Sequence, residues 1–345
     1  MVRTTTLLLL LMVTAPISHA QQYTITDLGT LSGYESRAFA INDRGDVVGE
    51  SISPNFSTHA FLWTRRTGMR ELTPTDGAEQ TAAYGVSATD EVALYAYNAI
   101  VWNAVDWEAR HVVNVGSYSV PQGINSFGTM AGYSSQSDHA FQWTKTGGLQ
   151  DLGTLGGPIS AAFAINDSGQ IVGYSAVPDG GPGHAFLWTQ QTGMQDLGTL
   201  GQEADAHAIS SSGMVAGVYW VNFNTAPFLW TPTGGLELLP TLPNAVTSTV
   251  GGINESGQVV GCALLTNNTE AGFLWTRAAG VQDLSSLIPN TKGFTQVCPT
   301  AINARGEIAA VGLNPKNRSH ALLLTPISPR TSAQTARRAV LVQER

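Results

Sequence analysis

The sequence predicts an all-β fold: a seven-bladed β-propeller of four-stranded blades, closed into a ring by an N-terminal strand that completes the last blade. Three observations predict it. One unit recurs seven times along the chain, and each unit divides into four short strand-like segments. The segment "YTITDLGTL", from Tyr23 to Leu31, matches the end of the repeated unit although it stands before the first unit.

The repeat is clearest in "AFAINDSGQIVGYS", which begins at Ala162 and recurs as "AFAINDRGDVVGES" from Ala38 and "VGGINESGQVVGCA" from Val250. The positions equivalent to its asparagine are Asn42, Ser87, Asn125, Asn166, Ser210, Asn254 and Asn303. Their spacings of 45, 38, 41, 44, 44 and 49 residues are typical of propeller blades. The copy that begins at Ala82 is the least similar.

Each unit contains four segments, which read "AFAIN", "QIVGYS", "HAFLWT" and "MQDLGTL" in the unit from Ala162. All four are rich in strand-forming residues, and turn signals separate them. In the first turn, Asn-Asp-x-Gly, the polar side chains cap a tight turn and Gly takes a positive φ. We interpret it as a hairpin turn and not a calcium loop, because the further oxygen ligands and distal Glu of an EF-hand are missing.

Two rows of side chains predict that neighbouring blades interlock. A small residue precedes the Ile or Val of each first strand: Ala40, Gly85, Gly123, Ala164, Ala208, Gly252 and Ala301. The third strands carry a bulky row: Trp63, Trp102, Trp143, Trp188, Trp230 and Trp275, with Leu324 in the last unit. We therefore assign these tryptophans to the core, where bulky faces pack on small ones.

Ring closure is predicted from the fourth strands. These carry an acidic or amide residue: Glu71, Asn114, Asp151, Asp196, Glu237 and Asp283. The seventh unit ends at "HALLLTPIS" without such a strand, and the opening "YTITDLGTL" supplies it, with Asp27 in the matching place. The propeller then spans residues 21–326 and leaves no exposed sheet edge. An open solenoid, the alternative architecture, needs no borrowed strand.

The two ends of the chain lie outside this predicted domain. Residues 1–20 read as a secretory signal peptide, with a basic start, a short apolar stretch and Ser18-His19-Ala20 before the cut. The protein is therefore expected to be secreted, periplasmic or extracellular, with no membrane span. Residues 327–345 form a basic tail, which we expect to be flexible.

The charge of the chain indicates which partners to expect, and its two cysteines indicate a disulfide. The net charge is -8 although the tail carries four Arg and one Glu, so the body is acidic and nucleic acid is not an expected partner. Cys262 and Cys298 are predicted to form a disulfide in an oxidising compartment, two free buried thiols being the alternative. We expect a monomer.

With these motifs in place, the repeat resembles the bacterial extracellular HAF repeat, named for a His-Ala-Phe triplet. The triplets begin at His59, His139 and His184, and His320-Ala321-Leu322 is a near copy. Departures are Asn98-Ala99-Ile100 and Ala226-Pro227-Phe228. The resemblance covers residues 23–326 and implies an exported repeat protein, without an activity, catalytic residues or a cofactor.

The repeated polar residues are expected to be structural. The triplet histidines are spread around the ring and cannot converge on one metal ion, so we expect each to bond a nearby turn. The fourth-strand acids are likewise too far apart for a glycosidase pair and are expected to bond turn backbone. No nucleophile elbow, phosphate loop or His-Glu-x-x-His motif is present, so no catalytic residue, metal or cofactor is assigned.

The loops between second and third strands vary most and predict the binding face. The fifth unit places Tyr219, Trp220 and Phe223 close together there, where they could stack on sugars or on a partner protein. The alternating spacing of Tyr219, Val221 and Phe223 fits an inward-packing strand equally well. Trp107, in the second unit, is a weaker candidate of the same kind.

We predict a non-catalytic binding module for an unknown extracellular polysaccharide or protein. The alternative is an extracellular carbohydrate-active hydrolase or lyase with its site on the loop face.

Overall fold

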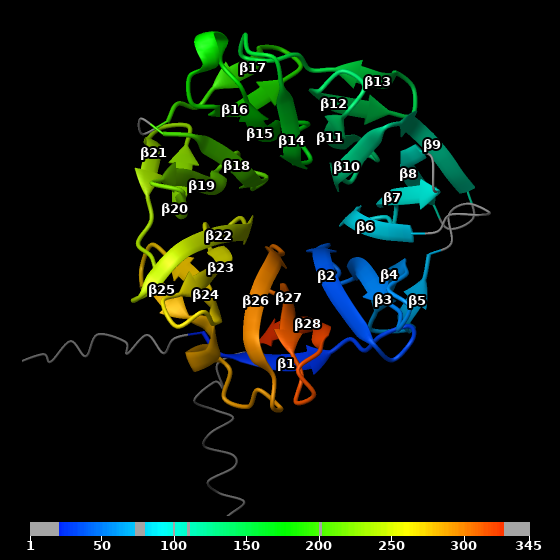
Figure 1. Ribbon diagram of the computed structural model, residues 1–345, viewed down its shortest axis with the longest axis vertical. Helices are drawn as coiled ribbons and strands as arrows, with labels where there is room; N and C mark the ends of the chain where they lie inside the picture. The colour runs from blue at the N-terminus through cyan, green and yellow to red at the C-terminus, as the bar shows by residue number, and fades with distance from the viewer. Residues whose placement is uncertain (1–20, 73–79, 99–100, 109–110, 200–201, 328–345) are drawn as a thin grey trace, which may run out of the picture.

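A computed structural model describes residues 21–72, 80–98, 101–108, 111–199 and 202–327. The predicted signal peptide, and the predicted tail from residue 328 onward, lie outside the described residues. Among the described residues, 28 strands form seven four-stranded antiparallel sheets around a common axis (Figure 1). The predicted all-β propeller with four-stranded blades is therefore confirmed.

Three sheets come from the first half of the chain. The first contains β2 (Glu35–Ile41), β3 (Val47–Ile52), β4 (Thr58–Thr64) and β5 (Gly68–Glu71). The second contains β6 (Gln80–Val86), β7 (Val92–Asn98), β8 (Val101–Glu108) and β9 (His111–Ser117). The third contains β10 (Ser119–Ile124), β11 (Met130–Ser134), β12 (His139–Thr144) and β13 (Gly148–Asp151).

Three further sheets follow in chain order. The fourth contains β14 (Ser160–Ile165), β15 (Ile171–Ser175), β16 (His184–Thr189) and β17 (Gly193–Asp196), with the short 3₁₀ helix η1 (Pro178–Gly180) after β15. The fifth contains β18 (Ala204–Ile209), β19 (Val215–Val221), β20 (Asn224–Thr231) and β21 (Gly235–Leu238). The sixth contains β22 (Ala245–Ile253), β23 (Val259–Leu265), β24 (Glu270–Thr276) and β25 (Gly280–Asp283), with η2 (Leu284–Leu287) after it.

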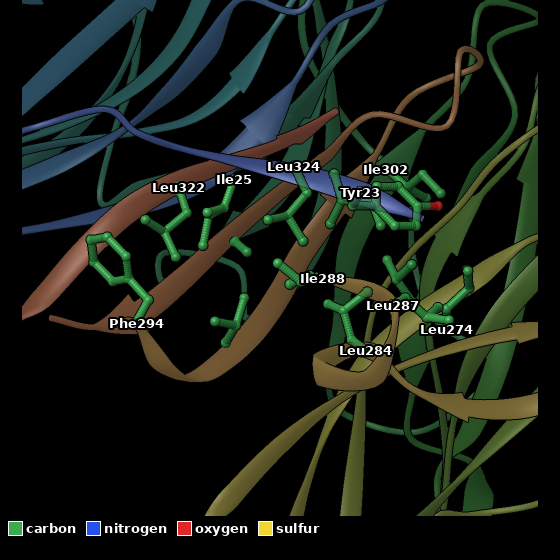
Figure 2. Packing of buried hydrophobic residues seen from close by; sticks show 14 residues of the cluster. Tyr23, Ile25, Leu274, Leu284, Leu287, Ile288, Phe294, Ile302, Leu322 and Leu324 are labelled. Atoms are coloured by element: carbon green, nitrogen blue, oxygen red, sulfur yellow. The ribbon is translucent and has the colours of Figure 1, made fainter. Parts of the chain in front are cut away.

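The last sheet joins the two ends of the chain. It contains β26 (Thr295–Ile302), β27 (Ile308–Leu313), β28 (Ser319–Pro326) and the N-terminal β1 (Tyr23–Asp27), which pairs antiparallel with β28. Asp27 lies opposite Leu322 in the register, as Glu71 lies opposite Phe61 in the first sheet. Tyr23 and Ile25 are buried against Leu322 and Leu324, and η2 covers the same cluster (Figure 2).

The blades interlock through bulky and small faces. Trp63 of the first sheet packs in one cluster with Ala301 and Ala309 of the last sheet. Trp188 of the fourth sheet likewise packs with Ala131 of the third. Small residues let the sheets approach closely, and the tryptophan faces fill the space between them.

The second unit requires a correction. At the register position of the third-strand tryptophans, this unit has Trp107, which lies opposite Val92 as Trp63 lies opposite Val47; Trp102 instead lies opposite Tyr97. By the same register, Asn103-Ala104-Val105 replaces Asn98-Ala99-Ile100 as the triplet. The reason is that β7 and β8 have 7 and 8 residues, against 5 and 6 in β15 and β16, so extra length went into the hairpin.

A β-bulge recurs in the innermost strand of every sheet. The ladder between first and second strands slips by one residue at the same place each time, as between Ala38 and Ala40 or between Ala162 and Ala164. The seven bulged residues are Phe39, Tyr84, Gln122, Phe163, His207, Gly251 and Thr300. A bulge re-aims a side chain, so these residues leave the pattern of their strands.

Candidate functional site

The seven bulged residues line one chamber of about 630 Å³ on the propeller axis. They come from β2, β6, β10, β14, β18, β22 and β26, the innermost strands of the ring (Figure 1). All seven are half-buried, because each has one side open to the chamber. We call this cavity the axial chamber. Its volume lies within the range of about 300–1,000 Å³ typical of small-molecule sites.

Two stacked aromatic pairs line the axial chamber. Phe39 stacks on Tyr84, with ring centroids 5.2 Å apart and planes inclined by 13°. Phe163 stacks on His207, with centroids 5.2 Å apart and planes inclined by 26°. Each pair bridges two neighbouring blades, so ring stacking both joins the blades and presents aromatic surface to the cavity.

Three polar side chains of the chamber make no hydrogen bond to the part of the chain that the structure describes. They are the Tyr84 hydroxyl, the Gln122 amide and the His207 ring. Burial raises the pKa of Tyr84 to about 12, with a smaller contribution from the charge of Glu50. Burial lowers the pKa of His207 to about 4. Both groups are therefore neutral near pH 7.

The chamber ends in an apolar collar. One residue per innermost strand forms it: Ile41, Val86, Ile124, Ile165, Ile209, Ile253 and Ile302. Four of these also line the axial chamber, and all seven line a second cavity of about 230 Å³ on the far side. The ligand-accessible end of the chamber is consequently the opposite one, near Thr249 and Pro299, on the side of the loops between second and third strands.

Beyond the collar, the Asn-Asp-x-Gly turns link the blades. Asn303 Nδ2 donates to the Asn42 carbonyl at 3.0 Å, and Asn42 Nδ2 donates to the Ser87 carbonyl at 3.0 Å. Asn125, Asn166 and Asn254 make the same bond to the next blade. The sequence predicted tight turns, and Gly45 has the expected φ of 84°. The sequence did not predict that the asparagines of these turns also donate hydrogen bonds to neighbouring blades.

Charged groups occur near the loop end of the chamber. Arg37 and Glu50 form an ion pair at 3.2 Å, and burial raises the pKa of Glu50 against the opposing effect of Arg37. Asp205 accepts a hydrogen bond from Trp220 Nε1 at 3.1 Å. Burial raises the pKa of Asp205, although the Trp220 bond lowers it, and burial together with Asp205 raises that of Glu203.

The three predicted binding residues of the fifth unit do not form one patch. Tyr219 is half-buried beside the core cluster of Val215 and Phe228, and it lines a separate cavity of about 310 Å³. Trp220 is 37% exposed, and Phe223 is 98% exposed at the hairpin tip, with φ of 69°. None of the three lines the axial chamber.

The triplet histidines bond an acid and not a turn, which corrects the prediction. His59 Nδ1 lies 2.8 Å from Glu71, His184 Nδ1 lies 2.8 Å from Asp196, and His139 pairs with Asp151 in the same way. The reason is that third and fourth strands are adjacent, so the two side chains meet across the ladder. The acids also accept from turn backbone, as Asp196 does from Gly198 N–H. His320 and Asp27 make this bond across the ring closure at 2.9 Å.

Cys262 of β23 and Cys298 of β26 are joined by a disulfide, with their Cα atoms 5.1 Å apart. The bond links the sixth and seventh sheets near the loop end of the chamber, as the sequence predicted for a pair. Separately, no helix among the described residues is long and apolar enough to cross a membrane.

The bulged residues were not singled out from the sequence, although a signal was present. They stand three positions before the repeated Asn or its equivalent, and the residue that follows each of them is Ala or Gly in every unit. Their own identities vary from Phe to Gly. A variable position inside a repeated strand indicates a side chain with a role beyond the packing that all units share.

Comparison with known proteins supports the fold. No protein-family model and no curated protein matches the sequence. TolB from Acinetobacter baumannii is similar with a TM-score of 0.50 and 12% identity, over 82% of this chain and 64% of that chain. The β-propeller domain of the Trilobed protease from Pyrococcus furiosus, which has an open velcro topology, is similar with a TM-score of 0.56 and 9% identity, over 86% of this chain and 94% of that chain. An acylaminoacyl peptidase from Pyrococcus horikoshii is similar with a TM-score of 0.55 and 10% identity, over 88% of this chain and 54% of that chain. The chain spans under two thirds of TolB and about half of the peptidase. At these identities the likeness defines a class of β-propeller proteins and nothing narrower.

Proposed function

We propose that this chain is an exported, non-catalytic binding module that takes its ligand in the axial chamber. The observation that carries the proposal is the recurrent bulge, which presents seven different side chains to one cavity. Purely structural positions are repeated in this chain, as the tryptophan row is. The variation among the seven bulged residues therefore favours a binding role over a structural one.

The unpartnered polar groups support the same proposal. Buried polar groups normally find hydrogen-bond partners in the protein, and polar groups that line an open cavity bond water. Tyr84, Gln122 and His207 lack a partner among the described residues and face one cavity. A ligand supplies what the protein does not. Aromatic surface with a few convergent polar groups is the usual composition of a binding site.

The predicted loop residues take a secondary place in this proposal. Trp220 is held by Asp205, which lies two residues before His207 on β18. A ligand seated in the chamber and extending toward the loop face passes near this indole. We propose Trp220 as an outer contact, with the exposed ring of Phe223 as a contact for longer ligands only.

We further propose that the seven sheets act as one closed ring, which keeps the chamber walls in place. Support comes from β1 pairing with β28, from the His320–Asp27 bond and from the Asn303–Asn42 bond. The resemblance to HAF repeats and the secretory signal remain predictions within this proposal.

A carbohydrate-active hydrolase or lyase is the second candidate. Glu203 and Asp205 have raised pKa values because of burial, and a raised carboxyl pKa suits a general acid. Asp205, however, already accepts the Trp220 bond, and the described lining of the axial chamber contains no carboxylate. The chamber itself thus lacks the acid pair that glycoside hydrolysis requires.

The test uses the mature protein, residues 21–345, on a panel of insoluble extracellular polysaccharides. Bound protein and released products are measured in the same tubes. We expect retention without products, at least tenfold weaker in Phe163→Ala, a few-fold weaker in Trp220→Ala, and unchanged in Phe127→Ala, whose ring is 75% exposed on the opposite face. Released products, or retention that depends on Trp220 but not on Phe163, would overturn the proposal.

A further inference from the structure

We infer that the axial chamber selects an uncharged sugar ring, such as a pyranose at the end of a glycan, over charged sugars. This inference rests on the proposed function of the chamber and names the chemistry of its ligand. It is carried by three properties of the described lining: the absence of charged side chains, the paired aromatic rings, and the kind of polar groups present.

The described lining of the chamber contains no Asp, Glu, Lys or Arg side chain. His207 adds no charge near neutral pH, because burial holds its pKa at about 4. Glu50, whose charge contributes to the raised pKa of Tyr84, is paired with Arg37 at 3.2 Å, and Asp205, outside the lining, accepts a hydrogen bond from Trp220 at 3.1 Å. A carboxylate or ammonium group brought into this cavity would lose water without gaining an opposite charge, which is costly.

The shape of the chamber suits a ring. The Phe39–Tyr84 and Phe163–His207 pairs place aromatic rings on two sides of the chamber, and Gln122 stands between them in ring order. The opposite side is open because Gly251 has no side chain. A Cβ there would lie 2.6 Å from the Pro299 carbonyl of the next blade, so the close approach of β22 and β26 requires glycine. A sugar ring can lie with its C–H face on an aromatic wall.

The polar inventory suits hydroxyl groups. A Tyr hydroxyl both donates and accepts, an amide offers two donors and an acceptor, and a neutral imidazole offers one of each. Sugar hydroxyls also donate and accept, so they can satisfy Tyr84, Gln122 and His207 together. A purely apolar ring would bury these groups unpaired, which costs binding free energy.

The collar determines which part of a glycan can enter. Seven β-branched side chains separate the axial chamber from the cavity beyond it. A glycan therefore enters from the loop face and stops at the collar, so the chamber receives a terminal ring.

Matched soluble glycosides test the selectivity. Neutral methyl hexopyranosides are compared with the corresponding methyl uronates and amino sugars by saturation-transfer NMR and competition at pH 7. We expect at least one neutral glycoside to bind, with its charged counterparts at least tenfold weaker. Phe163→Ala and Gln122→Ala should each lower its affinity at least fivefold, whereas Phe127→Ala should not. Melting curves verify that each variant is folded. If Phe163→Ala does not fold, Gln122→Ala alone tests the role of the chamber.

The outcomes separate the inference from the proposed function. Equal or tighter binding of a charged counterpart that still depends on Phe163 and Gln122 would overturn the inference and leave the chamber as the binding site. The inference would also be overturned if the protein is retained on the polysaccharide panel but binds none of the glycosides. Glycoside binding or panel retention that is insensitive to both substitutions would overturn the proposed function as well.

Discussion

At the residue scale, Asn303 shows how one side chain can serve both a turn and a blade junction. Its Oδ1 accepts from Arg305 N–H and Glu307 N–H, which fixes its own turn. Its Nδ2 donates to the Asn42 carbonyl of the first sheet. Ser87 and Ser210, the equivalents in two other units, retain turn bonds to Glu91 N–H and Met214 N–H. They are too short to reach the next blade.

This comparison gives the first prediction. Asn303→Ala should lower the free energy of unfolding by about 1–3 kcal/mol, because it removes the turn bonds and the inter-blade bond of a buried amide. Asn303→Ser is the matched control, since a serine keeps the turn bonds to backbone N–H groups and loses the two Nδ2 bonds, to the Asn42 carbonyl and to the Glu307 carboxylate; about half the loss is expected. Urea denaturation measures both. Equal stability of wild type and Asn303→Ala would contradict the role of the amide.

His207 gives a prediction for pH. Its folded pKa of about 4 lies below the ordinary value of 6.5, so the unfolded chain takes up the proton first. Its contribution to stability is complete above pH 6.5 and is lost as the pH falls toward 4. Between pH 6.5 and pH 4, the free energy of unfolding of the wild type should fall by up to about 1.4 kcal/mol per pH unit more than that of His207→Gln. Parallel stability curves for the two proteins, measured by denaturation from pH 7 to pH 4, would contradict the assigned burial.

At the element scale, β1 pairs with β28 and carries the proposed closure of the ring. Ile25 is 1% exposed and packs with Leu322 and Leu324, whereas Thr24, one residue earlier, is exposed. Ile25→Ala should lower the free energy of unfolding by about 2–5 kcal/mol, and Thr24→Ala by well under 1 kcal/mol. Removal of residues 21–31 should lower the melting temperature sharply. A deletion variant that melts like the wild type would exclude closure by β1.

The disulfide between β23 and β26 acts at the same scale. It closes a loop across 36 residues between two sheets. Replacement of both Cys262 and Cys298 by Ser should lower stability by about 3–4 kcal/mol, because the unfolded chain regains freedom. The wild type measured with a reducing agent should approach the double variant. A double variant as stable as the oxidised wild type would show that the neighbouring sheets need no such link.

The elements also show where prediction from sequence succeeded. Hydrophobic pattern and turn residues repeat in the chain, so the strands, the small and bulky rows and the borrowed strand with Asp27 could be predicted from the sequence. The second unit failed because its hairpin is longer. Counting along the sequence selected Trp102, whereas the ladder places Trp107 opposite Val92. Only strand pairing shows how an insertion is absorbed.

At the scale of the whole molecule, the candidate site is the part that sequence alone did not supply. Phe39, Tyr84, Phe163 and His207 are far apart in the chain and meet only because a ring brings equivalent positions to one axis. Trp220 and Phe223 stood out because aromatics in a short loop are easy to recognise. A bulge that turns one residue per blade toward the axis has no short motif and depends on seven strands at once.

The most direct test of the axial chamber as the binding site is a crystal structure of residues 21–345 soaked with the neutral glycoside that binds best. Density for a sugar ring against Phe163 and His207, within reach of Gln122, is the predicted result. Density only at Trp220, at Phe223 or beyond the collar, with an empty chamber, would contradict it.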